Sequence, residues 1–226
     1  YKGLGIEYIF ISTLISSIFT ILLLTPQILS SKLTFDSVLW KKMMIYALPL
    51  LVAGLAGMTN ETMDRILLKH LLPNSETASS ELGLYGAFYK LSIIMILFIQ
   101  TFRFAAEPFF FAQHKQKDDR KVYADVMKYF TIVMIIIFLG VTIFYDLVIG
   151  FLGTAYHDER GFLVVSILLL ANLFLGVYFN LSIWYKLTEK TIFGAYLAIF
   201  GAIITLLLNF ILIPKIGFIG SAWATL

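Results

Sequence analysis

Long apolar runs separated by short polar segments dominate the chain. A run of about 20 apolar residues is long enough for a helix to cross a hydrocarbon layer of about 30 Å. The runs near that length cover residues 7–24, 43–68, 84–104, 129–151, 162–184 and 192–213. Residues 217–226, GFIGSAWATL, read as the start of another span that the chain cuts short. The pattern predicts an all-α polytopic transmembrane helix bundle with six spans and a truncated seventh.

Prolines and polar clusters mark the expected ends of these spans. Proline removes a backbone donor and crowds the preceding helical turn. We therefore expect Pro26 to close the first span, Pro108 to bend or end the third, and Pro214 to break the sixth. Residues 69–82, KHLLPNSETASSEL, predict a polar loop. Either Asp36 or Ser37 is expected to cap a short helix that approaches the second span.

Composition supports the membrane assignment and excludes several classes of site. The chain is 60% hydrophobic and only 14% charged, whereas soluble domains have about 25% charged residues. It has no cysteine, which excludes a disulfide framework and a thiolate metal site. Its three histidines are far apart in sequence, so no local metal-ligand spacing exists. We expect neither a metal nor a cofactor.

Lysine and arginine are distributed unevenly between successive loops. Alternate loops carry ten such residues against three in the others. Cytoplasmic loops are the positively charged ones in membrane proteins. The distribution predicts that loops 27–42, 113–128 and 185–191 are cytoplasmic. The basic loop 113–128 is interpreted as a cytoplasmic loop and not as a nucleic-acid site.

The second span carries charges where a membrane helix rarely tolerates them. Ala53, Gly57, Asn60, Glu61 and Asp64 follow one face by their spacing of three and four residues. Charged groups at such depth tend to face a cavity or a buried network. The same spacing places Glu61 four residues before Arg65. An alternative is that these groups lie in the headgroup region, where such a pair contributes little to stability.

The third span carries polar residues near both ends. Gln100, Arg103 and Glu107 share a face, and the spacing of four predicts an Arg103–Glu107 pair. Lys90 lies near the opposite end of the span. A guanidinium binds phosphate through a planar fork of N–H donors, and an ammonium binds it as a point charge. Arg103 and Lys90 are therefore candidate contacts for an anionic headgroup, and the alternative is anchoring at the membrane interface.

Small residues gather in the second and sixth spans. They are Ala53, Gly54 and Gly57, and then Gly194, Ala195, Ala198, Gly201 and Ala202. Small residues let membrane helices approach closely. We interpret both groups as helix-packing positions.

Enzymatic motifs have little support. His114 and Asp119 have an H-x4-D spacing in a highly charged loop, where chance explains it. The acidic pair Asp158–Glu159 lies in a short outer loop and is interpreted as hydrated surface charge. The chain contains no P-loop, G-x-S-x-G or H-E-x-x-H motif. We therefore expect a protein that is not an enzyme.

Four segments carry a resemblance to a known family. They are ALPLL (47–51) with NETMDRILL (60–68), GLYGAFYKL (83–91), FRFAAEPFFF (102–111) before a basic loop, and LLNFILIPKIGFIGSAWATL (207–226). In this order they resemble the polysaccharide or O-antigen flippases of the multidrug/oligosaccharidyl-lipid/polysaccharide exporter superfamily. The resemblance spans nearly the whole chain, and segment 102–111 with the basic loop after it is similar to members of Bacteroidetes type.

The resemblance implies a longer protein of two helical lobes in a bacterial inner membrane. Residues 1–26 would be the last helix of the N-terminal lobe, 27–42 a cytoplasmic linker and 43–226 an incomplete C-terminal lobe. Such proteins move a polyprenyl-pyrophosphate-linked oligosaccharide from the cytoplasmic to the outer leaflet by alternating access. The implied partners are membrane lipids, this substrate and the polysaccharide biosynthesis machinery.

The resemblance also assigns roles to residues within the spans. Arg103, Lys90, Arg65, Asp64 and Gln100 are the candidate substrate-binding residues. Glu61 and Glu107 are the candidate proton-coupling groups. The predicted orientation places residues 60–65 toward the outer leaflet, and it leaves the first substrate contact to Arg103.

Three alternatives stay open. One is a non-catalytic membrane scaffold, which would not need paired charges within its spans. A cation-coupled antiporter of the same fold should have an acidic, aromatic-lined cavity, and the charges within the spans do not decide because three are basic and three acidic. A membrane glycosyltransferase or polymerase of the same pathway needs a large outer loop. The longest outer loop in this sequence is short.

Overall fold

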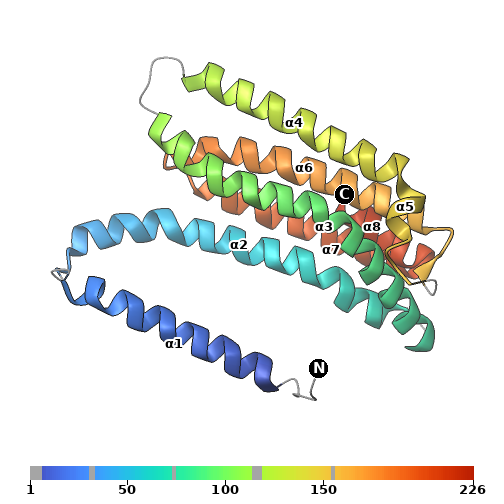
Figure 1. Cartoon of the computed structure of the whole chain (residues 1–226). Coiled ribbons are helices and arrows are strands. Elements are labelled where there is room, and N and C mark those ends of the chain that lie inside the picture. Colours follow the sequence, from blue (N-terminus) through green and yellow to red (C-terminus); the bar gives the residue numbers. More distant parts are fainter. Residues whose placement is uncertain (1–6, 31–33, 73–74, 114–118, 154–155) are drawn as a thin grey trace. The chain divides into compact units, whose positions relative to one another are not determined.

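The computed structural model describes residues 7–30, 34–72, 75–113, 119–153 and 156–226 (Figure 1). These residues form helices and no strand, and parts of the predicted loops 27–42 and 113–128, with His114, lie outside them. Six of the helices are long and apolar enough to cross a membrane. The predicted all-α polytopic bundle is confirmed. The helices are α1 (Glu7–Ser30), α2 (Ser37–Leu71), α3 (Ser75–Gln113), α4 (Asp119–Ile143), α5 (Tyr145–Ile149), α6 (Gly161–Leu187), α7 (Ile192–Ile216) and α8 (Phe218–Thr225).

Two prolines that were expected to end spans, and Pro108, which was expected to bend or end one, lie inside helices. Pro26 lies within α1, Pro108 within α3 and Pro214 within α7. Each proline removes only one backbone donor, and membrane helices tolerate such a loss where the rest of the helical ladder persists. The helices therefore continue two to five residues beyond their prolines.

The predicted polar loop at 69–82 is also wrong. Helix α2 continues to Leu71, and α3 already begins at Ser75. These helices have 35 and 39 residues, which corresponds to about 50–60 Å and exceeds the hydrocarbon thickness. Their polar ends can extend past the hydrocarbon and remain helical. At the start of α2, the predicted cap is present, because Asp36 Oδ1 accepts hydrogen bonds from the backbone N–H groups of residues 38 and 39 at 2.9 and 3.2 Å.

The chain divides into two compact units, Tyr1–Met43 and Met44–Leu226. The boundary falls next to the predicted end of the linker at residue 42, and the assignment of the units to two lobes stays a prediction. In the first unit, α1 has no buried residue. Its hydroxyl groups bond within the helix, as when Thr13 Oγ1 donates to the Ile9 carbonyl at 2.9 Å. Its apolar surface suits contact with lipid.

The second unit has a core built around α6, which lies between α3 and α4 in Figure 1. Helix α7 packs on α8 as a hairpin. The fully buried side chains include Phe88 of α3, Met134 of α4, Leu168 of α6 and Phe218 of α8. Close packing of this kind drives helix association in membranes, where lipid removes most of the hydrophobic advantage. The core therefore fixes α3, α4, α6 and the α7–α8 hairpin in one body.

Two tight turns place the helix ends that matter for the site. Glu189, with φ 58°, follows α6, and the Lys190 N–H returns to the Tyr185 carbonyl at 2.9 Å. This is a Schellman motif with glutamate where glycine is usual. Gly217, with φ 60° and ψ −140°, separates α7 from α8. That backbone conformation strongly favours glycine.

Candidate functional site

The second unit contains a groove of about 760 Å³ between α2, α6 and α7. Pockets for small ligands usually measure about 300–1,000 Å³, so the groove is large enough for a ligand or a substrate headgroup. Its apolar wall includes Phe174 and Phe179 of α6 and Leu197 of α7. Residues of α8 and the side chain of Arg103 from α3 complete the lining.

The small residues of α2 and α7 line this groove and mostly do not make close packing contacts. A Cβ atom added to Gly54, Gly57 or Gly201 would meet no atom within 4 Å. All three glycines belong to the groove lining. The helix-packing interpretation is therefore wrong for them, because the facing helices stand apart there. It is right for Gly194, where an added Cβ would come within 2.8 Å of the Tyr185 ring.

Among the residues that the structure describes, two charged residues line the groove, and both are basic. They are Arg103 and Lys186. Uncharged polar side chains from four helices also face the groove. These are Asn60 of α2, Tyr178, Ser182 and Tyr185 of α6, Thr205 of α7 and Thr225 of α8.

The Glu107 carboxylate contacts both Arg103 and Lys186. Lys186 Nζ lies 2.6 Å from Glu107 Oε1, and Arg103 Nη2 lies 3.5 Å from the same oxygen. The Arg103 guanidinium also lies over the Phe179 ring, 4.0 Å from its centroid. The predicted Arg103–Glu107 pair is confirmed, and Lys186 joins it. Two positive charges and one negative charge leave this end of the groove with an excess of positive charge.

Polar contacts join α2 to the rest of the unit on both sides of the groove. Thr191 Oγ1 donates to the Tyr46 carbonyl at 2.9 Å, and Tyr46 Oη donates to the Lys186 carbonyl at 3.4 Å. About five turns further along α2, Tyr85 Oη donates to Asp64 Oδ2 at 2.6 Å. The stretch of α2 between these contacts contains the glycines that line the groove.

Of the predicted substrate-binding residues, only Arg103 lies in the groove lining. Lys90 and Gln100 have exposed side chains outside it. Arg65 is also exposed and lies over the Tyr89 ring, 4.8 Å from its centroid. The structure therefore does not gather Arg103, Lys90 and Arg65 at one point.

The acidic residues of α2 form contacts with tyrosines of α3. Asp64 is 2% exposed and accepts hydrogen bonds from Tyr85 and from the Arg65 backbone N–H. Glu61 Oε1 accepts a hydrogen bond from Tyr89 Oη at 3.1 Å. These contacts show that Asp64 links two helices. Asp64 therefore belongs to a buried network, which was one interpretation of the charged cluster, and does not lie free in the headgroup region. Asn60, one turn earlier, faces the groove.

The sequence did not predict that Lys186 lines the groove, nor that its backbone carbonyl contacts α2. The sequence pattern places Lys186 only among the charges of loop 185–191, which is predicted to be cytoplasmic. Its partner Glu107 lies 79 residues away in the sequence, so no helical spacing connects them. The contact of Tyr46 with Thr191 spans 145 residues. The one local feature that could have identified Lys186 as a site residue is its place at the end of a span rich in aromatic residues.

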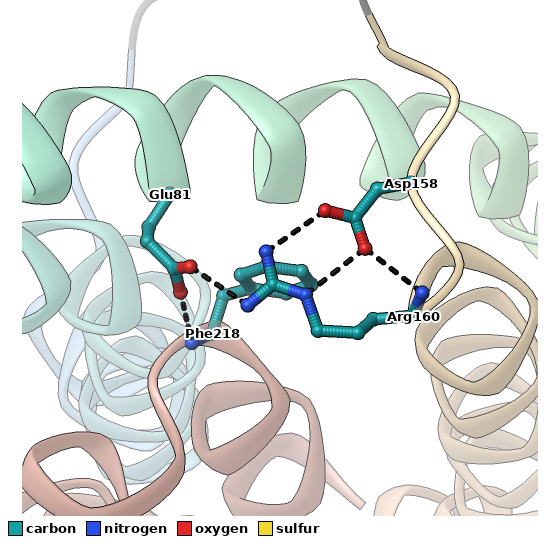
Figure 2. Close-up of polar contacts among 4 residues, drawn as sticks. All are labelled: Glu81, Asp158, Arg160 and Phe218. Atoms are coloured by element: carbon teal, nitrogen blue, oxygen red, sulfur yellow. Dashed lines mark hydrogen bonds and ion pairs between the residues drawn. The ribbon is translucent and has the colours of Figure 1, made fainter.

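A second group of polar contacts surrounds Arg160, and we call Glu81, Asp158, Arg160 and Phe218 the Arg160 clamp (Figure 2). Arg160 Nη1 lies 2.8 Å from Glu81 Oε1, and Nη2 lies 2.8 Å from Asp158 Oδ2. The guanidinium lies 4.3 Å from the centroid of the Phe218 ring. Glu81 Oε2 accepts a hydrogen bond from the Phe218 backbone N–H at 3.1 Å. The clamp ties α3, the segment before α6 and the α7–α8 turn together.

The clamp corrects the interpretation of the acidic pair. Asp158 was expected to be a hydrated surface charge, but the hydrogen bonds from Arg160 hold it and lower the pKa of its carboxyl. An added Cβ at Gly217 would collide with the Glu81 carboxylate. Glycine at this turn therefore permits the approach of Glu81 as well as the unusual backbone conformation.

Within the described residues, no group of three histidine, cysteine, aspartate or glutamate side chains is arranged to hold a metal ion. Comparisons of the chain with protein-family models, with curated proteins and with solved structures give no match.

Proposed function

We propose that this chain is part of a transporter that moves a polyprenyl-pyrophosphate-linked oligosaccharide from the cytoplasmic to the outer leaflet of a bacterial inner membrane. The sequence motifs at 47–51, 60–68, 83–91, 102–111 and 207–226 suggest the substrate class. The groove between α2, α6 and α7 would hold the headgroup during alternating access. The polyprenyl chain would remain in the lipid.

The charge of the groove lining carries this proposal. Among the residues that the structure describes, the charged residues of the lining are Arg103 and Lys186, and both are basic. A guanidinium and an ammonium together suit the oxygens of a pyrophosphate. Both cations share Glu107, so a bound pyrophosphate would replace that carboxylate as their partner. Tyrosine, serine and asparagine groups along the lining would bond to the sugar hydroxyls.

An antiporter for cationic compounds fits the groove less well. A cavity for cations should present carboxylates, and none lines this groove among the described residues. Glu107 is turned to Lys186 and Arg103. Protonation of Glu107 would release both cations, which makes it the better placed of the two candidate coupling groups. Glu61 bonds to Tyr89 outside the groove.

The test is flipping of a fluorescent polyprenyl-pyrophosphate saccharide in vesicles that contain the full-length protein. We expect Arg103→Gln and Lys186→Gln each to lower the flipping rate about tenfold or more, because each loses a charge-assisted contact of about 1.5–3 kcal/mol. Lys190→Gln is the matched control. Lys190 lies four residues after Lys186, in the turn that follows α6, with an exposed side chain outside the groove.

Wild-type flipping by both Arg103→Gln and Lys186→Gln would refute the assignment of the groove. Equal loss in Lys190→Gln would show that the positive charge of the loop matters and not the groove. Transport of a cationic dye in place of the lipid-linked saccharide would favour the antiporter.

A further inference from the structure

A second, much smaller cavity lies next to Arg103, among α3, α4 and α6. Its volume is about 10 Å³, and a buried water needs about 10–15 Å³ by the same measure. Most of its wall is apolar, with Phe102, Phe130 and Phe179 among the lining residues. The polar residues of the wall are Arg103, Glu107 and Asn180. The space therefore suits one small polar molecule.

Two of the residues that line this cavity have a buried polar atom without a hydrogen-bond partner among the described residues. The atoms are Arg103 Nε, which is a donor, and Asn180 Oδ1, which is an acceptor. Asn180 is only 9% exposed, and its Nδ2 donates to the Gly176 carbonyl at 3.1 Å. A carbonyl can only accept, so this bond fixes which end of the amide is Oδ1. Buried polar atoms are rarely left without a partner, because each costs about 1–3 kcal/mol.

We infer that the small cavity binds one water molecule, which accepts a hydrogen bond from Arg103 Nε and donates one to Asn180 Oδ1. The charges around the cavity select a neutral occupant. Glu107 and the Asn180 oxygen repel an anion, and Arg103 repels a cation. Water can accept from one side and donate to the other, which neither simple ion can do.

The water makes Asn180 a positioning residue for Arg103. The guanidinium has its face against Phe179 and its Nη2 near Glu107. The water at Arg103 Nε would hold the edge of the guanidinium that these contacts leave free. The planar group then presents one orientation to the groove. Hydrogen bonds that hold a binding group from behind determine how well that group is oriented toward its ligand. This functional consequence rests on the proposed function, whereas the water site itself does not.

The water site is tested by a structure of the full-length protein in lipid nanodiscs at a resolution that shows ordered water. We expect a density peak within hydrogen-bond distance of both Arg103 Nε and Asn180 Oδ1. It should be lost in Asn180→Leu, which removes the acceptor at similar volume. A wild-type cavity without density, or a peak that persists in Asn180→Leu, would overturn the site.

The positioning role is tested by a double-mutant cycle on the flipping rate at limiting substrate. We expect Asn180→Leu to lower this rate about three- to tenfold, which corresponds to one hydrogen bond. Arg103→Lys keeps the charge and lacks Nε, so Asn180→Leu should cause no further loss in that background. Asn172→Leu is the matched control, because Asn172 lies on α6, is 8% exposed and bonds to a backbone carbonyl of α3.

Independent losses in the double variant would overturn the positioning role, as would an equal loss in Asn172→Leu. If Arg103→Lys and Arg103→Gln both flip the lipid at the wild-type rate, the proposed function is contradicted at this residue. In that case the density peak between Arg103 Nε and Asn180 Oδ1 still tests whether the cavity binds water.

Discussion

Asp158 shows how a single residue of the segment before α6 acquires a structural role. It accepts two hydrogen bonds from the Arg160 guanidinium and a third from the Arg160 backbone N–H. These bonds favour the ionised form and lower the pKa of Asp158 below the ordinary value of about 3.9. A carboxyl with a lower pKa in the folded state stabilises the fold above its unfolded pKa. That contribution is lost as the pH falls through the folded pKa.

We therefore predict that the melting temperature of the purified protein in detergent falls as the pH drops below about 4. In Asp158→Asn the fall over that range should be smaller, and the melting temperature at pH 7 should be lower. Thermal unfolding monitored by tryptophan fluorescence measures both. The neighbouring Glu159→Gln, at an exposed side chain, should retain the wild-type pH dependence. Identical curves for wild type and Asp158→Asn would contradict the role of the clamp.

At the residue scale, the predictable contacts are the local ones. The Arg103–Glu107 pair follows from a spacing of four on one helix, and the Asp36 cap follows from its place before α2. Lys186 was not predictable, because its carboxylate partner is 79 residues away. The sequence also assigned substrate binding to Lys90 and Gln100, which lie outside the groove. Which face of a helix meets a cavity depends on neighbours that no local pattern specifies.

The element that defines the groove is α2, and its attachment to α3 rests on two tyrosines of unequal burial. Tyr85 is fully buried and bonds to the buried Asp64 at 2.6 Å. Tyr89 is partly exposed and bonds to the exposed Glu61 at 3.1 Å. A buried carboxyl that loses its donor cannot turn to water. An exposed carboxyl can do so at little cost.

We predict that Tyr85→Phe lowers the free energy of unfolding by about 1–3 kcal/mol and that Tyr89→Phe lowers it by less than about 1 kcal/mol. Both substitutions remove one hydroxyl from α3, so each serves as the control for the other. Chemical unfolding in mixed micelles, followed by circular dichroism, gives the two values. Equal losses would indicate that the bond to Asp64 does not hold α2 against α3.

The small residues of α2 illustrate why an element's role was misjudged. Gly54 and Gly57 read as packing positions because membrane helices commonly meet at glycine. In the structure the space beside them is open. Small side chains widen a groove as readily as they bring helices together. Only the distance to the next helix distinguishes the two roles.

For the molecule as a whole, the distribution of lysine and arginine predicts the orientation in the membrane. The α6–α7 turn, with Lys190, should be cytoplasmic, and the segment before α6, with Glu159, should be outside. The chain has no cysteine, so an introduced cysteine is the one thiol within residues 1–226, and the parent protein without that substitution gives the labelling background. In intact cells, a membrane-impermeant maleimide should label Glu159→Cys. It should label Lys190→Cys only after permeabilisation, and the reverse pattern would invert the topology.

The sequence by itself determined the class of the protein, because apolar runs long enough to cross a bilayer leave an all-α bundle as the expected architecture. It also determined the number of helices long and apolar enough to cross a membrane in the part of the chain that the structure describes, and the local pair Arg103–Glu107. Helix ends were less predictable, since prolines and polar residues are tolerated inside long membrane helices.

Only the tertiary structure decided which polar residues meet when they lie far apart in the sequence. It brought Lys186 to Glu107, Thr191 to Tyr46 and Arg160 to Glu81 across long separations in the sequence. The physical reason is that a hydrogen bond or ion pair acts over a few ångströms. Helical periodicity describes only residues within a few turns of each other, so contacts between helices depend on how the whole bundle packs.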